Sequence, residues 1–300
     1  MTRTVLLTGA SGGLGTASTI ELTRRGWKVI AAVRSIDDEF APLRDATAGH
    51  PGDVQPLLLD LLQDASIVAA AQQLAAVPLD AVVHNAGVGA FATFEDTPIE
   101  AWQTIFQVNL LGPMRLTALL LPSMRARGSG RIVAVSSYTA RLGIPFASVY
   151  GASKAGLERW IETLAVELKS FGISAHALET GMFDTPMVNG PKPPQDPHSP
   201  YRHVYDRLEP YRGRMISTAK PPKQFATVLA NTLEAKNPPI LRPVGTDAHA
   251  LYAAQRLLPS RFMPALFRLA FRQDRRPRLR LRITGGDEVP PVAQIRTDLD

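Results

Sequence analysis

Tyr150 and Lys154 stand four residues apart in a segment whose apolar spacing predicts a helix over Val149–Ser170. Four residues make slightly more than one helical turn, so both side chains are expected on one face of that helix. A tyrosine hydroxyl with its usual pKa of about 10 is a poor base at neutral pH. Because a neighbouring ammonium favours the phenolate, the spacing predicts a tyrosine of lowered pKa, suited to general acid–base catalysis.

Ser137 precedes Tyr150 by thirteen residues and follows the strand-like run Arg131–Ser136. In open α/β sheets, ligands bind beyond the carboxyl ends of the strands, and both Ser137 and the helix of Tyr150 start there. A Tyr-x-x-x-Lys pair alone arises often by chance. The added serine makes these three residues a candidate catalytic site.

A glycine-rich turn joins the first predicted strand to the first predicted helix. Its sequence is Thr8-Gly9-Ala10-Ser11-Gly12-Gly13-Leu14-Gly15, with the glycine spacing Gly-x-x-x-Gly-x-Gly. Such glycines let the backbone turn sharply and let a pyrophosphate approach the N-terminus of the helix. The turn therefore predicts a dinucleotide site, and a glycine-rich turn without a ligand is the alternative.

Arg34 follows the second predicted strand, Val29–Val33, near the place where an NAD site carries an acid. A carboxylate would repel a ribose 2′-phosphate, whereas a guanidinium binds it with charge-assisted hydrogen bonds. The sequence thus favours NADP(H) over NAD(H), with a solvated loop arginine as the alternative. Asp37 and Asp38 come slightly too late to hold the ribose.

The elements that must position these residues alternate between short apolar runs and longer amphipathic runs. Continuously apolar strands are typical of a parallel sheet covered by helices on both faces. The pattern predicts one α/β domain, a doubly wound (Rossmann-type) seven-stranded parallel sheet, without internal repeats. Its expected strands are Val5–Thr8, Val29–Val33, Gln55–Leu59, Ala81–His84, Arg131–Ser136, Ile173–Leu178 and Ile240–Arg242, and its expected helices are Leu14–Arg25, Ala65–Ala76, Ile99–Val108, Pro113–Arg127, Val149–Ser170 and Lys223–Leu233.

Over residues 4–245 the chain resembles the short-chain dehydrogenase/reductase family. The resemblance implies hydride transfer between a nicotinamide and a carbonyl carbon, with Tyr150 as general acid or base. Lys154 would lower the pKa of Tyr150 and hold the nicotinamide ribose, and Ser137 would hydrogen-bond the substrate oxygen. Asn109 would hold a water chain that resupplies Lys154, and a helix-kink or capping asparagine is its alternative reading.

The resemblance also implies the cofactor contacts. Asp60 should meet the adenine, and the backbone of Phe183 and the hydroxyl of Thr185 should meet the nicotinamide amide. Two positions depart from the family pattern: His84 replaces an asparagine, best read as a hydrogen-bonded histidine, and Thr180 replaces a proline. The full expected set is Thr8, Gly9, Ser11, Gly13, Leu14, Gly15, Arg34, Asp60, Leu61, Asn85, Ala86, Gly87, Tyr150, Lys154, Gly181, Phe183 and Thr185.

The segment Gly143–Tyr150 is similar to the branch of the family that contains 17β-hydroxysteroid and retinol dehydrogenases. This implies a hydrophobic alcohol or ketone as the small-molecule substrate. Apolar and aromatic side chains are the usual lining of such a pocket. The candidate lining residues, each of which could instead belong to the core, are Leu142, Phe146, Phe183, Met187, Tyr201, Tyr205 and Tyr211.

Two segments interrupt the alternating pattern of the predicted domain, residues 1–245. Residues 186–222 carry nine prolines, which predicts a substrate loop or lid with a short helix near His203–Leu208. After the domain come an amphipathic extension, residues 246–271, and an arginine-rich tail, residues 272–300, expected to be disordered. The extension could pack on its own domain or cover the pocket, lie on an anionic membrane surface, or bind a partner protein.

Composition limits the remaining function classes. The net charge of +6 comes mostly from the tail, so it gives no argument for nucleic-acid binding. The chain has no cysteine and no metal-ligand spacing of histidines, which predicts no metal site. No run approaches the ~18 apolar residues of a membrane span, so we expect a cytoplasmic protein, with peripheral membrane contact left open. A homo-oligomer is implied by the resemblance; a catalytically silent NADP(H)-sensing or scaffold protein is the rival function.

Overall fold

The computed structural model describes residues 2–189 and 198–257, and seven parallel strands form its single sheet. The strand order is β3-β2-β1-β4-β5-β6-β7, so the sheet is doubly wound as the sequence predicts. The strands are β1 (Thr4–Thr8), β2 (Lys28–Val33), β3 (Asp53–Leu58), β4 (Ala81–His84), β5 (Gly130–Ser137), β6 (Ile173–Thr180) and β7 (Leu241–Val244).

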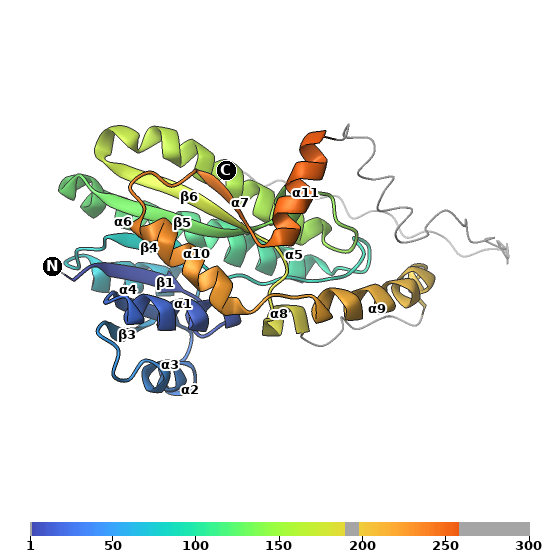
Figure 1. The fold of residues 1–300 in the computed structure, drawn as a ribbon, viewed down its shortest axis with the longest axis horizontal. Coiled ribbons are helices and arrows are strands. Elements are labelled where there is room, and N and C mark those ends of the chain that lie inside the picture. The colour runs from blue at the N-terminus through green and yellow to red at the C-terminus, as the bar shows by residue number, and fades with distance from the viewer. Residues whose placement is uncertain (1, 190–197, 258–300) are drawn as a thin grey trace, which may run out of the picture.

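Helices cover both faces of the sheet (Figure 1). Side chains of β1 point alternately to the two faces of the sheet. Leu6 belongs to the core on one face, with Leu116 and Leu157. Leu7 belongs to the core on the other face, with Leu22 and Phe225. The first face carries α4 (Asp64–Leu74), α6 (Gly112–Arg127) and α7 (Ser148–Glu167), and the second carries α1 (Gly13–Arg24) and α10 (Pro222–Glu234).

One continuous helical run leads from the edge of the sheet into its core. It joins α5 (Ile99–Phe106), the π-helical turn η1 (Gln107–Leu111) and α6. Among the described residues this is the one helix whose length and composition would let it cross a membrane, with a mean hydropathy of 1.3. Leu116, Leu120 and Met124 of α6 lie in the core of the domain, and that burial accounts for the apolar composition.

Several short helices were not expected from periodicity, because fewer than two turns give no periodic signal. They are α2 (Ile36–Glu39), α3 (Ala41–Ala46), α8 (Pro186–Asn189) and the 3₁₀ turns η2 (Tyr138–Ala140) and η3 (Lys169–Phe171). Ser35 begins α2, since its hydroxyl accepts a hydrogen bond from the amide of Asp38 at 3.3 Å.

The expectation of a short helix at His203–Leu208 is wrong in extent. Helix α9 spans Arg202–Ser217 and continues through Pro210. Its second turn is fixed by tertiary contacts, because the buried Tyr205 hydroxyl donates to Asp96 at 2.8 Å. Such contacts override the local penalty of a proline within a helix.

Helix α11 (Thr246–Leu257) packs back onto its own domain. Tyr252 donates a hydrogen bond to Glu179 of β6, and Gln255 Nε2 donates to the carbonyl of Arg141 at 3.2 Å. Helices α8, α9 and α11 gather at the end of the sheet where its strands end (Figure 1). Residues 258–300, with the arginine-rich tail, and residues 190–197 lie outside the described residues.

Candidate active site

Ser137 and Tyr150 meet at the carboxyl end of β5. Ser137 ends the strand and begins η2, where its Oγ accepts a hydrogen bond from the amide of Thr139 at 3.2 Å. Tyr150 lies in the first turn of α7, is buried, and shares a hydrogen bond with the Ser137 hydroxyl. The predicted pair is therefore in direct contact, as the sequence spacing suggests.

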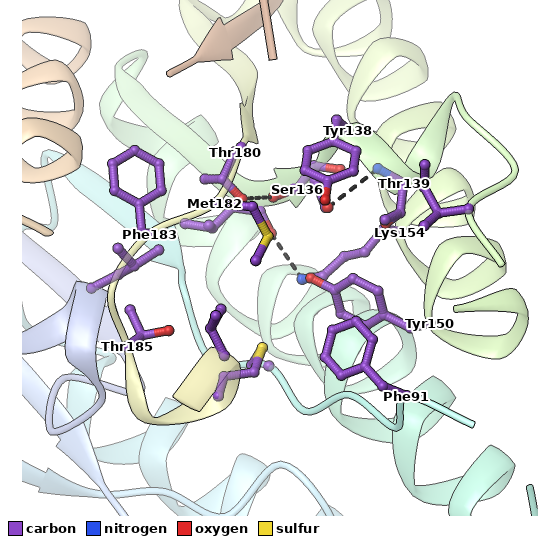
Figure 2. Close-up of a pocket in the computed structure, with 18 of the residues that line it drawn as sticks. Phe91, Ser136, Tyr138, Thr139, Tyr150, Lys154, Thr180, Met182, Phe183 and Thr185 are labelled. Atoms are coloured by element: carbon purple, nitrogen blue, oxygen red, sulfur yellow. Dashed lines mark hydrogen bonds between the residues drawn. The ribbon is translucent and has the colours of Figure 1, made fainter. Parts of the chain in front are cut away.

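Lys154 lies one helical turn after Tyr150 and reaches the same corner (Figure 2). Its Nζ donates a hydrogen bond to the carbonyl of Val135 at 2.8 Å and stands 5.8 Å from the centroid of the Tyr150 ring. Burial lowers the pKa of Lys154 to about 8, while the charge of Glu158 acts to raise it.

The expectation of a lowered pKa for Tyr150 is wrong for this structure. Burial raises the pKa of Tyr150 to about 12, and the hydrogen bond with Ser137 only partly opposes it. The ammonium of Lys154 donates its hydrogen bond to the carbonyl of Val135 and stands 5.8 Å from the centroid of the Tyr150 ring. The four-residue spacing correctly predicts that Tyr150 and Lys154 lie on one face of α7. It does not show how deeply that face is buried, and burial sets the direction of the pKa of Tyr150.

Asn109 lies in the π-helical turn η1 and is almost fully buried. Its Nδ2 donates to the carbonyl of Val88 at 2.9 Å, and its Oδ1 accepts from the amide of Val88 at 2.9 Å. A third bond links Nδ2 to Ser153 Oγ on α7 at 3.0 Å. Asn109 therefore fixes the loop after β4 to the helix that carries Tyr150.

Asn109 and Lys154 also approach each other around Gly87. A Cβ atom added to Gly87 would stand 3.3 Å from Asn109 Oδ1 and 3.4 Å from Lys154 Nζ. The structure thus brings all four predicted catalytic residues to one corner, from three different elements. The single π-helical turn at Asn109 is the kind of irregularity that often occurs at functional sites.

A pair of carboxylates behind this corner was missed at the sequence level. Glu158 Oε1 accepts from Ser136 Oγ at 2.7 Å, and Arg141 Nε stands 3.5 Å from Glu158 Oε2 and 2.7 Å from Glu179 Oε1. Burial raises the pKa of Glu158 to about 7, and burial also raises the pKa of Glu179. Glu158 lies on α7 and Glu179 on β6, so no local sequence motif predicts that they form a pair.

The glycine turn is fixed to the loop after β4. Asn85 Nδ2 donates to the carbonyls of Thr8 and Gly9 at 3.0 and 2.9 Å, and the amide of Ala86 donates to Thr8 Oγ1 at 3.0 Å. Gly15 packs against this turn, because an added Cβ would stand 2.1 Å from the carbonyl oxygen of Gly9. No larger residue fits there without moving the backbone.

The segment after β6 closes over the same turn. A Cβ added to Gly13 would stand 2.8 Å from Thr185 Cγ2, so Thr185 lies directly on the turn. Thr180, which replaces the proline of the family pattern, donates a hydrogen bond from its hydroxyl to the carbonyl of Ser136 at 2.8 Å (Figure 2). The amide of Gly181 then extends the pairing with β7 by donating to Val244 at 2.9 Å.

A cleft of about 470 Å³ runs along the turn, and its donor chemistry fits a nicotinamide dinucleotide. Helix α1 begins without a side-chain cap and has no acid in its first turn, which leaves its positive end facing the cleft. The predicted residues on this cleft are Thr8, Gly9, Ser11, Gly13, Leu14, Arg34, Asp60, Leu61, Asn85, Ala86, Gly87 and Thr185. Sequence reasoning missed Glu39, which lines the cleft beside Arg34.

The sequence and the fold are similar to those of known proteins. The family model for short chain dehydrogenase matches residues 3–195. The chain belongs to the short-chain dehydrogenase family. It is similar to retinol dehydrogenase 8 of Bos taurus (30% identical, covering 86% of each chain) and to 17-beta-hydroxysteroid dehydrogenase type 1 of Homo sapiens (31% identical, covering 79% of this chain and 76% of that one). The resemblance to this branch is therefore confirmed.

A solved structure agrees with the fold. The short-chain dehydrogenase from Streptomyces avermitilis is 28% identical, with a TM-score of 0.75 over 92% of this chain and 99% of that chain. The shared architecture extends beyond the residues of the family model.

In this short-chain dehydrogenase a second cavity, of about 330 Å³, opens beside the cofactor cleft. Tyr150 and Lys154 line it, and Phe91 packs against the Tyr150 ring with centroids 6.3 Å apart (Figure 2). Gly181, predicted to meet the cofactor, lies on its wall. The other apolar or aromatic side chains on its wall include Leu14, Tyr138, Ile144, Phe146, Met182, Phe183, Met187, Val188, Ile216 and Leu251.

The sequence prediction of this wall was correct for Phe146, Phe183 and Met187. It was wrong for Leu142, which is buried away from the cavity, and for Tyr205, which packs behind Phe146 with ring centroids 5.4 Å apart. Tyr201 is also absent from the described wall, and the Tyr211 side chain lies outside the described residues. Phe91, Ile216 and Leu251 were missed, because separate loops and helices bring them there.

His84 is a buried structural residue, as its sequence reading proposed. Its Nε2 is 2.7 Å from Thr117 Oγ1, and burial lowers its pKa to about 3. Across residues 2–189 and 198–257, no group of three or more histidines, cysteines or acids is placed to hold a metal ion.

Proposed function

We propose that this protein is an NADP(H)-dependent oxidoreductase that interconverts a hydrophobic alcohol and the corresponding ketone. One observation carries the proposal: Tyr150, Lys154 and Ser137 lie on the wall of the apolar cavity, at its junction with the dinucleotide cleft. Asn85 and Gly87 line both spaces, so a nicotinamide and a carbonyl group would meet there.

The side chains divide the chemistry of carbonyl reduction. When bound, NADP(H) supplies or takes up the hydride. The Tyr150 hydroxyl gives its proton to the substrate oxygen during reduction and takes it back during oxidation. A high tyrosine pKa in the free protein keeps that proton in place before the reaction, and the nearby Lys154 ammonium stabilises the phenolate that remains.

Two further residues position this exchange. The Ser137 hydroxyl, bonded to Tyr150, can donate to the same substrate oxygen and stabilise the charge that develops on it. Asn109 holds the loop of Val88 against α7 and, beside Lys154, occupies the place from which a water chain would return protons.

Arg34 supports NADP(H) as the cofactor. It lies on the cofactor cleft with its side chain three-quarters exposed, so its guanidinium is accessible to a ribose 2′-phosphate. The apolar wall of the second cavity and the names of the relatives, a retinol and a 17β-hydroxysteroid dehydrogenase, support a hydrophobic alcohol or ketone.

The remaining assignments follow from the same proposal. Residues 1–245 form the dehydrogenase domain, residues 186–222 its substrate loop, and α11 of the extension covers the cavity through Leu251. We assign the protein to the cytoplasm as a homo-oligomer with a small-molecule partner and no nucleic acid. The membrane reading of residues 246–271 receives no support from α11, whose Tyr252 is bonded to β6.

The test begins with fluorescence titration of purified protein with NADPH and NADH, followed by turnover of a panel of hydrophobic ketones with NADPH. Tyr150→Phe should keep NADPH binding within about twofold and lower turnover by about 10²–10⁴-fold, because it removes the proton donor. Tyr138→Phe, which changes another buried tyrosine of the same cavity, should leave turnover within about threefold.

Three results would refute the proposal or a part of it. Failure of the wild-type protein to bind either dinucleotide would remove the cofactor site. NADPH binding without turnover of any ketone or alcohol would favour the silent sensor or scaffold function. Full turnover by Tyr150→Phe would remove the tyrosine from the mechanism.

A further inference from the structure

Glu39 turns its carboxylate back from α2 into the cofactor cleft. Its Oε2 accepts hydrogen bonds from Ser11 Oγ at 2.9 Å and from the backbone amide of Arg34 at 3.0 Å. Its Oε1 accepts from the Arg34 guanidinium at 3.2 Å. Glu39 thus joins the glycine turn after β1 to the end of β2. Its two partners, Ser11 and Arg34, are the groups best placed to meet the adenosine ribose.

The Glu39 carboxylate is ionised at neutral pH. Partial burial acts to raise its pKa, but the hydrogen bonds from Arg34 and Ser11 and the charge of Arg34 outweigh burial and lower it. Only 22% of the Glu39 side chain is exposed, against 75% of the Arg34 side chain. The acid is therefore a fixed part of the cleft wall, and the guanidinium extends from it toward solvent.

A 2′-phosphate and the Glu39 carboxylate would compete for the same cation. Arg34 can bind either anion with charge-assisted hydrogen bonds, and two anions side by side repel each other. A ribose 2′-hydroxyl carries no charge and can donate to a carboxylate, so the competition penalises only the phosphorylated cofactor.

We infer that Glu39 is a specificity-determining residue that weakens the preference of Arg34 for NADP(H) over NAD(H). This inference rests on the proposed function, because it concerns the cofactor cleft of that function. Without Glu39, the Arg34 guanidinium would select strongly for the 2′-phosphate of NADP(H). The Glu39 carboxylate reduces this selectivity because it partly neutralises the guanidinium. Specificity in the cleft is the difference between these attractive and repulsive contacts.

The test measures the dissociation constants of NADPH and NADH by fluorescence titration, at one ionic strength, for the wild-type protein and Glu39→Gln. Glutamine keeps the size and a hydrogen-bond acceptor but removes the charge. We expect NADPH to bind about tenfold more tightly to the variant, while NADH binds equally or more weakly. The measured quantity is the ratio of the two constants, which does not depend on turnover.

Asp38→Asn provides the matched control. Asp38 belongs to the same short helix and loses the same unit of charge, but its carboxylate is bonded to Ser35 Oγ at 2.8 Å and not to Arg34. The control should change the NADPH constant by less than about twofold, because an exposed charge without direct contact is strongly screened.

The outcomes separate this inference from the proposed function. If the wild-type protein binds neither cofactor, the proposed function fails. The role of Glu39 is refuted if the wild-type protein binds the cofactors but Glu39→Gln leaves the ratio of the NADH and NADPH dissociation constants unchanged. It is also refuted if Asp38→Asn changes this ratio as much as Glu39→Gln does. In both cases the proposed cofactor site is retained. Parallel weakening of both cofactors would assign Glu39 a purely structural role and would also overturn the inference.

Discussion

The two ends of the active-site cleft are built in different ways. At the cofactor end, the Asn85 side chain donates hydrogen bonds to the carbonyls of Thr8 and Gly9, and the side chains of Thr8 and Asn109 accept from the amides of Ala86 and Val88. At the substrate end, apolar side chains from α8, α9, α11 and the loops before α5 and α7 form much of the cavity wall, beside Tyr150 and Lys154.

The two ends differ in how precisely their geometry is fixed. Hydrogen bonds to the backbone fix a geometry that tolerates few substitutions, which suits a cofactor of constant structure. Apolar side chains can be exchanged with modest cost while the cavity changes shape. We therefore expect substitutions at the cofactor end to weaken cofactor binding more than substitutions at the substrate end weaken substrate binding.

The largest effect is expected from Gly15→Ala at the cofactor end. The new methyl group would stand 2.1 Å from the carbonyl oxygen of Gly9, so the turn must move. We expect NADPH affinity to fall by about a hundredfold in fluorescence titration, since overpacking costs typically about 1–3 kcal/mol. Gly143→Ala is the control, because nothing lies within 4 Å of its added Cβ. Equal affinities for the two variants would show that the turn is not rigid.

A smaller effect is expected from Leu251→Ala at the substrate end. Leu251 of α11 lines the apolar cavity, so its truncation should raise the KM of a bulky hydrophobic ketone about three- to tenfold. The dissociation constant of NADPH should stay within about twofold. Leu257→Ala, on the same helix with 82% exposure, should change neither value. An effect of Leu251→Ala on NADPH alone would contradict the separation of the two ends.

The smallest effect is expected from Glu158→Gln, between the two ends. The pKa of Glu158 is about 7, so above that pH its charge supports the ammonium of Lys154, whose pKa is about 8. Removing the Glu158 charge should lower the pKa of Lys154. As the pH rises, the variant should therefore lose activity at a lower pH than the wild-type protein. We expect kcat/KM for NADPH about threefold below wild type at pH 8 and equal to it at pH 6.

Glu162→Gln, one turn further along α7, is the control for this pH dependence. Glu162 is paired with Arg159 at the surface, at 2.8 Å, so its removal should leave the pH profile unchanged. Equal loss at pH 6 and pH 8 in Glu158→Gln would point instead to a packing defect around Ser136.

The fold class, the seven strands and the convergence of Ser137, Tyr150 and Lys154 could be predicted from the sequence. These features depend on local patterns: apolar alternation, a glycine turn between a strand and a helix, and the four-residue spacing of Tyr150 and Lys154. The carboxyl ends of parallel strands lie at one edge of the sheet, so motifs that follow different strands must converge.

The burial of side chains and the contacts between elements could not be predicted from the sequence, because they depend on the complete fold. Burial set the direction of the Tyr150 pKa, because the whole fold decides how far a hydroxyl lies from water. Glu39 reaches Arg34 and Ser11 from the end of the short helix α2, and Leu251 reaches the cavity from the extension. Such contacts join residues whose separation along the chain carries no pattern, so no local signal could predict them.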